Sequence, residues 1–410
     1  MKKIKILPIL LAILLILPSC SGGARKRAQT NDSINKDQAL SIEMPSEKDI
    51  FGETRISFAA AGDNIIHEAV FTDAKNNAAV YASSTGIATK YRFTEMYEGV
   101  ADIIKNADIS YLNHETPVAG ESFGISGYPD FNAPSEIGND LSEVGFDIIN
   151  IANNHMLDMK ESGYRNSINY WNEKSAQHGI TMIGGYTKDD YDSVKYIEKD
   201  GVKIALLSYL TFINDSHKNS LSASSELVIP YANKNTMTRQ VGIAKENGAD
   251  IIIVSMHWGT ENDLKPRQSQ IDYANHLASL GVDVILGTHS HTLQPVEWIE
   301  GENGHKTLCA YSLGNLLSTM HYNEYMVGGI LTFDIVADDM GARIENPILI
   351  PTMCHYSMTR DSLKLYTLEN YTEELLKSHG SQLKRAFTMN TLLQRLDDTI
   401  SGEFLPEAFK

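Results

Sequence analysis

The sequence predicts an α/β protein with a mostly parallel core sheet. Five apolar runs that are typical of buried strands each end in polar residues able to bind a metal. Helix-like segments lie between several of these runs, which is the alternation expected of βαβ units. A buried strand gains nothing from a polar end, so five such ends suggest that strand termini converge on one site. The five runs are residues 56–63, 109–115, 148–155, 251–257 and 284–291.

The remaining segments fit the same alternation. Apolar residues at helical spacing predict helices over residues 92–106, 134–144, 160–178, 235–247 and 267–280. Pro134 and Ser135 favour a helix start at that position. Two further strands are expected at 181–183 and 202–210. The strand-rich segments 308–315, 328–337 and 344–350 have short connections and suggest antiparallel additions, and residues 361–397 have a helical pattern.

Composition limits the functions that the chain can have. Of its 410 residues, 42% are hydrophobic, which supports a globular core, and the formal net charge is −17. Removal of residues 1–19 takes away three lysines and leaves a charge of about −20. A surface this acidic argues against sequence-independent nucleic-acid binding, which needs basic contacts to phosphates. It would also repel a polyanionic polymer unless basic groups or metal ions intervene.

The N-terminus is predicted to be a targeting segment. Lysines precede an apolar stretch that is too short to span a bilayer comfortably, and this stretch ends in Leu17-Pro18-Ser19-Cys20. That ending resembles the bacterial lipobox, which implies cleavage of residues 1–19 and lipidation of Cys20. The alternative is an ordinary secretory signal with an incidental cysteine. Residues 20–55 are polar and are expected to form a flexible tether between the lipid and the body of the protein.

Two cysteines remain in the predicted body. An exported protein could pair Cys309 with Cys354, but both lie in apolar, strand-like segments, so two buried free thiols are an equally good interpretation. Neither cysteine has the CxxC spacing of a metal or redox site.

The polar strand ends offer the donor set of a divalent-metal site. Carboxylate, amide and imidazole groups together suit Zn, Mn or Fe, and the lack of thiolates argues against a structural zinc. Two ions that share a carboxylate could activate water and hold both oxygens during displacement at phosphorus. Each strand end alone could be a turn or a hydrogen-bonded histidine. Together, they would leave several buried polar groups unpaired unless they form one site. The potential ligands at these strand ends are Asp63, Glu115, Asn154, His155, Asp158, His257, His289 and His291.

These motifs occur in the order and spacing of a known family. The chain contains Gly62-Asp63, Asn113-x-Glu115, Ala152-Asn153-Asn154-His155-x-x-Asp158, His257-Trp258-Gly259-x-Glu261, Gly287-x-His289-x-His291, Gln294-Pro295-x-Glu297 and Ser312-Leu313-Gly314-Asn315. From about residue 56 to 320 it resembles the bacterial CapA-type capsule (poly-γ-glutamate) synthesis proteins. That family is similar to the calcineurin-like metallophosphoesterases, so the resemblance implies a four-layer αββα sandwich with one or two divalent ions.

The resemblance also implies roles for individual residues. Glu115 would bridge the ions, and His155, oriented by Asp158, would act beside the substrate as general acid or electrostatic clamp. The metal shell that the resemblance implies consists of Asp63, Glu115, Asn154, His257, His289 and His291. A further group would line the pocket or support the ligands, namely Asn113, Trp258, Glu261, Gln294, Glu297 and Asn315. His321 and Tyr322 are candidates for the pocket rim. Arg267 could meet an anionic substrate, although a surface charge at a helix start explains it as well.

The sequence departs from the metallophosphoesterase pattern at two ligands, and one of them is the bridging carboxylate, which is Glu115 rather than an aspartate. Those enzymes begin with Asp-x-His, but the residue two positions after Asp63 is Ile65. His67 is a candidate replacement, and a surface or hydrogen-bonding role explains it equally well. His114 should point away from the site because neighbouring residues of a strand face opposite sides. Hydrolase activity is therefore left open at this point.

The expected organisation is a CapA-like domain over residues 56–340 and a C-terminal extension over 341–410. The expected function is that of a lipid-anchored protein outside the cytoplasm that hydrolyses or transfers a phosphoester-type bond in capsule or envelope polymer synthesis. The alternative is a non-catalytic accessory protein that binds an anionic polymer or its membrane synthase. A nucleotidase-type scavenger is less favoured because no separate nucleotide domain is evident. The expected partners are the membrane, the polymer and the synthase, and no nucleic acid.

Overall fold

The structure is a computed structural model that describes residues 52–322 and 325–410. The predicted signal segment 1–19, Cys20 and nearly all of the predicted tether 20–55 lie outside the described residues. Within the described ranges, no helix combines the length and apolar character needed to cross a membrane.

One mixed sheet of eight strands carries the first group of site residues. β1 is central, with β2, β3 and β4 following in parallel on one side and β14, β15 and β16 added antiparallel on the other. The short strand β13 pairs in parallel with the end of β1. The strands are β1 (Thr54–Asn64), β2 (Ile109–His114), β3 (Ile148–Asn150), β4 (Thr181–Ile183), β13 (Asn315–Leu317), β14 (Val327–Asp338), β15 (Gly341–His355) and β16 (Lys364–Thr367).

A second mixed sheet of six strands carries the other site residues. Its order is β11-β12-β10-β9-β7-β6, with four central parallel strands and an antiparallel strand at each edge. The strands are β6 (Lys195–Lys199), β7 (Val202–Leu210), β9 (Ile251–His257), β10 (Val284–Thr288), β11 (Val296–Glu300) and β12 (Lys306–Ala310). A separate two-stranded sheet pairs β5 (Tyr186–Thr187) with β8 (Leu227–Val228).

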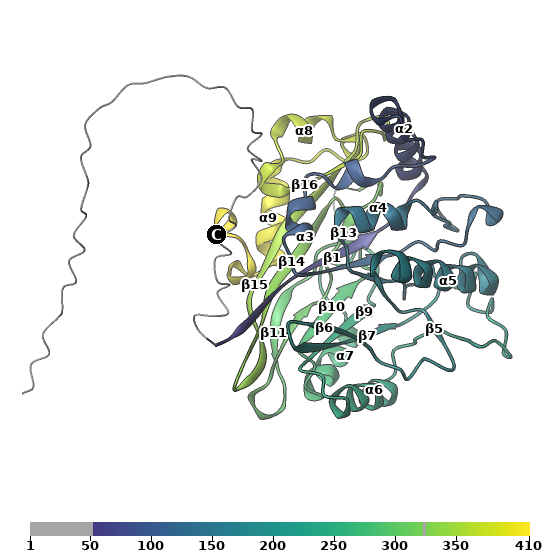
Figure 1. Cartoon of the computed structure of the whole chain (residues 1–410). Coiled ribbons are helices and arrows are strands. Elements are labelled where there is room, and N and C mark those ends of the chain that lie inside the picture. The colour runs from purple at the N-terminus through teal and green to yellow at the C-terminus, as the bar shows by residue number, and fades with distance from the viewer. Residues whose placement is uncertain (1–51, 323–324) are drawn as a thin grey trace, which may run out of the picture. The chain divides into compact units, whose positions relative to one another are not determined.

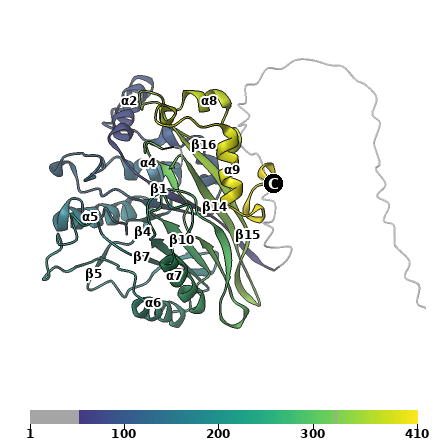
Figure 2. The same cartoon turned by 180° about the vertical axis from the view of Figure 1, so that it is seen from behind.

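Helices cover the outer faces of the two sheets. In Figures 1 and 2, α4 and α5 lie on one side of the strands and α6 and α7 on the other. The helices on the first side are α2 (Glu68–Thr85), α3 (Ala101–Lys105), α4 (Ile137–Val144) and α5 (Lys160–His178). Those on the second side are α6 (Lys234–Glu246) and α7 (Gln268–Ser279). Near the C-terminus, α8 (Glu373–Ser378) and α9 (Met389–Thr399) follow β16.

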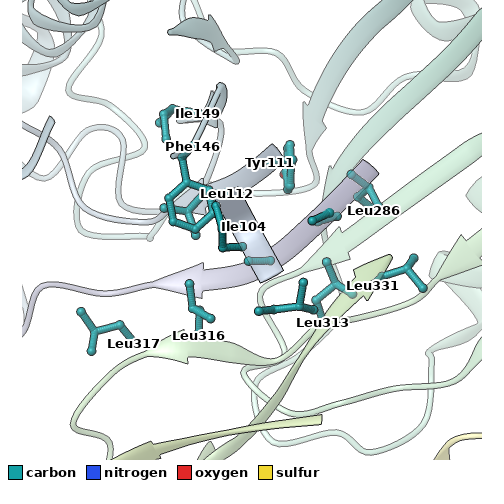
Figure 3. Close-up of a cluster of buried hydrophobic side chains, with 14 of the residues drawn as sticks. Ile104, Tyr111, Leu112, Phe146, Ile149, Leu286, Leu313, Leu316, Leu317 and Leu331 are labelled. Carbon is teal, nitrogen blue, oxygen red and sulfur yellow. The ribbon is translucent and has the colours of Figure 1, made fainter. Parts of the chain in front are cut away.

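The two sheets pack face to face. Alternate residues of the second sheet join one core with the first sheet, while the residues between them form a separate core with α6 and α7. Figure 3 shows the first core, in which Leu286 of β10 lies near Leu331 of β14. A hydrogen bond also joins the two sheets, since Tyr111 Oη of β2 and Ser255 Oγ of β9 lie 2.6 Å apart. The predicted four-layer α/β architecture is thus confirmed.

Most predicted elements are confirmed, and two predictions need correction. The long helical pattern over 361–397 is wrong, because the structure has strand β16, then α8, short 3-10 turns and α9. The alternation in Lys364–Thr367 places Leu365 in the core, which favours a strand. The prediction over 92–106 is also divided, into a 3-10 turn at Thr94–Tyr97 and α3. Helix α2 was not predicted, since its buried side consists mainly of small residues around Val70.

The two body cysteines are free and buried. Cys354 donates its thiol to Ser318 O at 3.1 Å, so it behaves as a packed, hydrogen-bonded group. Of the two interpretations left open by the sequence, the structure has the free thiols.

Candidate metal centre

Two buried carboxylates mark the site end of the first sheet. Asp63 follows Gly62 near the end of β1, and Glu115 directly follows the parallel neighbour β2. A Cβ atom on Gly62 would lie 2.0 Å from Gly314 O, so only glycine permits this close crossing of the chain. Both carboxylates are fully buried, which is costly unless a partner compensates the charge.

Asn113 holds the two carboxylates together. Its Nδ2 donates to Asp63 Oδ1 at 2.7 Å and lies 3.4 Å from Glu115 Oε2. Its Oδ1 accepts from Asn150 Nδ2 at 2.8 Å, and Asn150 in turn accepts from Ser208 of the second sheet. Asn113 was predicted to contact the substrate, and in the structure it positions the carboxylates.

Three histidines from the second sheet meet these carboxylates. His257 is the last residue of β9, while His289 and His291 follow β10. His291 Nδ1 lies 3.0 Å from Asp63 Oδ2, and its Nε2 lies 3.6 Å from Glu115 Oε1. His257 Nε2 lies 3.8 Å from the same Glu115 oxygen. Glu115 is therefore the residue that faces both histidine strand ends, and its bridging role stays a prediction.

The strand predicted over residues 284–291 does not extend to His289 and His291. Strand β10 ends at Thr288, and the two histidines have φ angles of 92° and 57°. Such left-handed backbone is strained for residues with a Cβ atom. Here it folds the chain around Asp63, since the His289 N–H donates to Asp63 Oδ2 at 3.2 Å. Both rings still reach the carboxylates, so the two residues converge through a strained turn.

These residues form two overlapping sets with ligand atoms close enough for metal ions. Within each set, the ligand atoms lie within 4.8 Å of one another, and Glu115 belongs to both. The sets are Asp63, Glu115 and His257, and Glu115, His289 and His291. In the described part of the chain, Glu115 Oε1 and His289 Nδ1 are buried without a hydrogen-bond partner. Unpaired buried acceptors beside carboxylates and imidazoles fit a divalent cation.

The electrostatics of the pocket agree with this fit. Burial, then the neighbouring Asp63, raises the pKa of Glu115 well above its usual range. Burial and the neighbouring His289 lower the pKa of His257 well below its usual range, and burial and His291 do the same for His289. Neutral imidazoles are the forms that donate a lone pair to a metal. A cation would relieve the cost of the crowded carboxylates.

Asn154 joins the site through His257. Its Oδ1 lies 2.8 Å from His257 Nε2, and its Nδ2 donates to Asn214 at 2.9 Å. The other ring nitrogen of His257 pairs with Thr288 at 2.9 Å, which fixes the ring plane. Asn154 therefore lies against a predicted metal ligand, and its own metal role stays a prediction.

His155 and Asp158 form a pair beside the metal-ligand sets. His155 Nδ1 lies 2.8 Å from Asp158 Oδ2, and that same oxygen accepts the Phe131 N–H at 2.8 Å. The ring of Phe131 packs edge-on against His155 with centroids 4.8 Å apart. These contacts hold the imidazole in one orientation with its Nε2 directed away from Asp158.

Ile65 and His67 bear on whether the centre has the histidine ligand that its first motif lacks. Ile65 is buried and has no ligand atom to offer. His67 starts α2, and its Nδ1 accepts the Thr319 N–H at 3.3 Å. Burial and the nearby His291 lower its pKa to about 3. Within residues 52–322 and 325–410, the close ligand sets do not include His67, so its predicted metal role stays a prediction.

Several residues predicted to line the pocket have other contacts. Trp258 is buried in the core beside α7 and donates to Tyr311 O at 2.9 Å. Gln294 accepts from Gln270 and donates to the backbone of Asp263, so it braces the loop after β9.

Glu297 and Glu261 are both exposed. Glu297 accepts a hydrogen bond from Tyr311 Oη, and the charge of Glu261 helps to raise the pKa of Glu115. Asn315 pairs with Asp63 in the β1–β13 register, and its side-chain amide donates to Ser318 Oγ and Tyr325 O. His114 points away from the site onto Trp171, as expected. Arg267 is exposed and pairs with Asp263.

Sequence reasoning missed Asn214. This residue contacts both Asn154 and His155 Nδ1, the latter at 3.3 Å, and so links a ligand strand to the His155 pair. It lies four residues beyond the end of β7, a strand that ends in apolar Leu210. A search restricted to polar residues at strand ends passes over it, whereas a search of the following loop would have found it.

Comparisons with known proteins agree with the motifs. Residues 57–320 match the family described as bacterial capsule synthesis protein PGA_cap. The chain is 28% identical over 236 residues to the PGA biosynthesis protein CapA of Bacillus subtilis (strain 168), covering 56% of this chain and 57% of that protein. It is also 28% identical over 239 residues to the capsule biosynthesis protein CapA of Bacillus anthracis, covering 56% and 55%. The chain thus spans little more than half the length of the curated relatives that it matches.

Among solved structures, the calcineurin-like phosphoesterase YfkN from Bacillus subtilis is similar with a TM-score of 0.43 and 13% identity. The alignment covers 84% of this chain and 98% of that chain.

Proposed function

The chain belongs to the family of bacterial capsule synthesis proteins described as PGA_cap, and from this premise we propose that it is a metal-dependent enzyme of capsule or envelope polymer synthesis. The proposed reaction is hydrolysis or transfer of a phosphoester-type bond. The observation that carries the proposal is the pair of ligand sets that share Glu115, together with its unpaired Oε1 in the described part of the chain. Lewis-acid polarisation of a phosphoryl oxygen is the chemistry that bound divalent ions would supply.

His155 is the proposed general acid. Asp158 engages Nδ1, which leaves Nε2 to carry a proton toward the leaving oxygen. Phe131 limits rotation of the ring and lowers the local exposure to water. Asn113 and Asn150 keep the two carboxylates in place, and Asn154 supports His257.

The proposed location is the outer side of a membrane. Cleavage of residues 1–19 and lipidation of Cys20 would anchor the protein, with residues 20–55 as the tether. The proposed partners are the membrane, an anionic polymer such as poly-γ-glutamate and its synthase. Nucleic acid is not among them, because the net charge of −17 opposes it.

A second candidate function is non-catalytic binding of the polymer or its synthase. The buried Ile65 favours it, because this residue stands where metallophosphoesterases have a metal-binding histidine. A centre with fewer histidines could hold metal as a binding element without turnover.

A hydrolysis assay separates the two functions. Purified protein loaded with Mn²⁺ or Zn²⁺ is expected to hydrolyse an aryl phosphodiester or phosphomonoester. The variant His155→Ala is expected to lose about 10²- to 10⁴-fold in rate while keeping its metal, since it removes a general acid and no ligand. The exposed His178 at the end of α5 provides the matched control His178→Ala, which should keep the wild-type rate. No turnover with any metal and substrate would contradict catalysis and favour the binding function.

A further inference from the structure

A loop of the C-terminal segment brings an arginine to the side of the metal centre. Arg360 lies between β15 and β16, beyond the residues 57–320 that match the family. Its Nη2 donates to Thr319 O at 2.5 Å and to Thr319 Oγ1 at 3.0 Å. Thr319 in turn donates its N–H to His67. One residue therefore separates the guanidinium from a histidine of the predicted site.

The contacts continue from His67 to the proposed general acid. The His67 ring packs edge-on against Phe131 with centroids 5.4 Å apart, and Phe131 packs against His155 in the same way. Arg360 thus lies on the side of the centre where His67 and His155 lie.

The guanidinium has capacity to bind an anion. Among the residues that the structure describes, no carboxylate forms an ion pair with Arg360, and its buried Nε has no hydrogen-bond partner. The adjacent Asp361 accepts instead from the hydroxyls of Ser357 and Thr359. A half-buried arginine without an acidic partner is unusual in a chain of net charge −17.

The backbone presents Arg360 in a defined position. Its φ angle is 62°, and its N–H donates to Ser357 O at 2.9 Å, which closes the turn. Nearby cationic groups extend the positive character, because Arg360 and the exposed Lys384 both help to lower the pKa of His321.

We propose that Arg360 forms an anion-binding subsite that holds an oxyanion group of the substrate, phosphoryl or carboxylate, beside the metal centre. The planar fork of arginine binds both groups through paired, charge-assisted hydrogen bonds. The subsite offsets the repulsion that the acidic surface exerts on an anionic substrate. This inference rests on the proposed function, because it takes the substrate to be an anion. It does not require that the protein catalyses a reaction.

The test measures anion binding by isothermal titration calorimetry on the full-length, Mn²⁺-loaded protein. The two probes are inorganic phosphate and a short γ-linked glutamate oligomer, which distinguish a phosphoryl from a carboxylate ligand. Arg360→Gln is expected to weaken binding of at least one probe by roughly tenfold or more. Arg360→Lys should weaken it by about threefold, because a point charge replaces the fork. The control Arg239→Gln removes an exposed arginine of α6 that pairs with Asp192, and it should leave binding unchanged.

Equal binding of both probes by wild type and Arg360→Gln would overturn the subsite, as would equal weakening in Arg239→Gln. If Arg360→Gln does not fold, unchanged binding in Arg360→Lys would overturn it as well. Binding that depends on Arg360 in a protein without turnover would refute the proposed catalysis and support the subsite. Turnover in a protein whose anion binding is the same with and without Arg360 would support the proposed catalysis and refute the subsite.

Discussion

Two clusters of buried histidines in this molecule have opposite characters. At the candidate metal centre, the rings of His257 and His289 lie 4.8 Å apart. In the C-terminal part, the rings of His355 and His379 lie 5.3 Å apart. Both places thus contain buried histidine rings packed closely together, so neither burial nor ring proximity identifies a site.

The difference lies in the partners. His379 pairs its Nε2 with Cys354 O at 2.9 Å and its Nδ1 with Ser381 N at 3.0 Å, while His355 pairs with Tyr371 at 2.8 Å. At the centre, His289 Nδ1 has no partner within the described ranges, and two carboxylates stand nearby. Satisfied histidines stabilise the fold, whereas a buried histidine with an open ring nitrogen beside carboxylates, as at His289, indicates a ligand.

The largest expected effect is a loss of metal affinity at the candidate metal centre. His289→Ala removes a ligand from one of the two sets, so metal affinity should fall by at least about a hundredfold. Calorimetric titration with Mn²⁺ and Zn²⁺ measures it, with elemental analysis of the purified protein for the stoichiometry. His379→Ala serves as the control and should bind metal as the wild type does. Equal metal binding by both variants would mean that the open histidines are not ligands.

A smaller effect is expected in the C-terminal cluster. His379→Ala leaves Cys354 O and Ser381 without partners and opens a gap in the core, so the free energy of unfolding should fall by about 2–3 kcal/mol. Urea unfolding of the metal-free protein measures this loss. The metal-free His289→Ala variant should lose less, because this histidine has an unpaired Nδ1 in the described part of the chain. A larger loss in His289→Ala would contradict the distinction.

The smallest effect concerns pH. Burial lowers the pKa of His379 to about 4, whereas the unfolded chain binds the proton near pH 6.5. The stability that neutral His379 contributes is therefore present above pH 6.5 and is lost as the pH falls toward 4. Between pH 7 and pH 5, the free energy of unfolding of the wild type should fall by up to about 2 kcal/mol more than that of His379→Ala. The stability gap between the two proteins should narrow accordingly, and a constant gap in urea unfolding at the two pH values would refute the assignment.

The sequence predicted the layered fold and most ligand positions because both follow from local patterns. Continuous apolar runs mark the buried strands, and their polar ends mark the site edge, so Asp63, Glu115 and His257 could be placed before the structure. The helix α5 was predicted at its observed bounds, because its spacing is regular and Gly179 ends it in a left-handed conformation.

Features that depend on distant contacts could not be predicted. The strained turn at His289 exists because its N–H reaches Asp63, which is 226 residues away in the chain. Arg360 reaches the rim through Thr319, and nothing in the local sequence around 360 points to that contact. Asn113 matched a motif, but its role in holding carboxylates depends on Asn150 from the next strand.

The position of the candidate site between the two sheets affects the stability and the degradation of the protein. Asp63 and Glu115 come from one sheet and His257, His289 and His291 from the other, so an ion that binds there would fasten two layers that the chain alone must otherwise hold together. Such an ion binds the native state only, and at a hundredfold excess over its dissociation constant it would add about 2.7 kcal/mol to stability. Metal scarcity would then act as a degradation signal, because copies without the ion would unfold more often and meet proteases sooner.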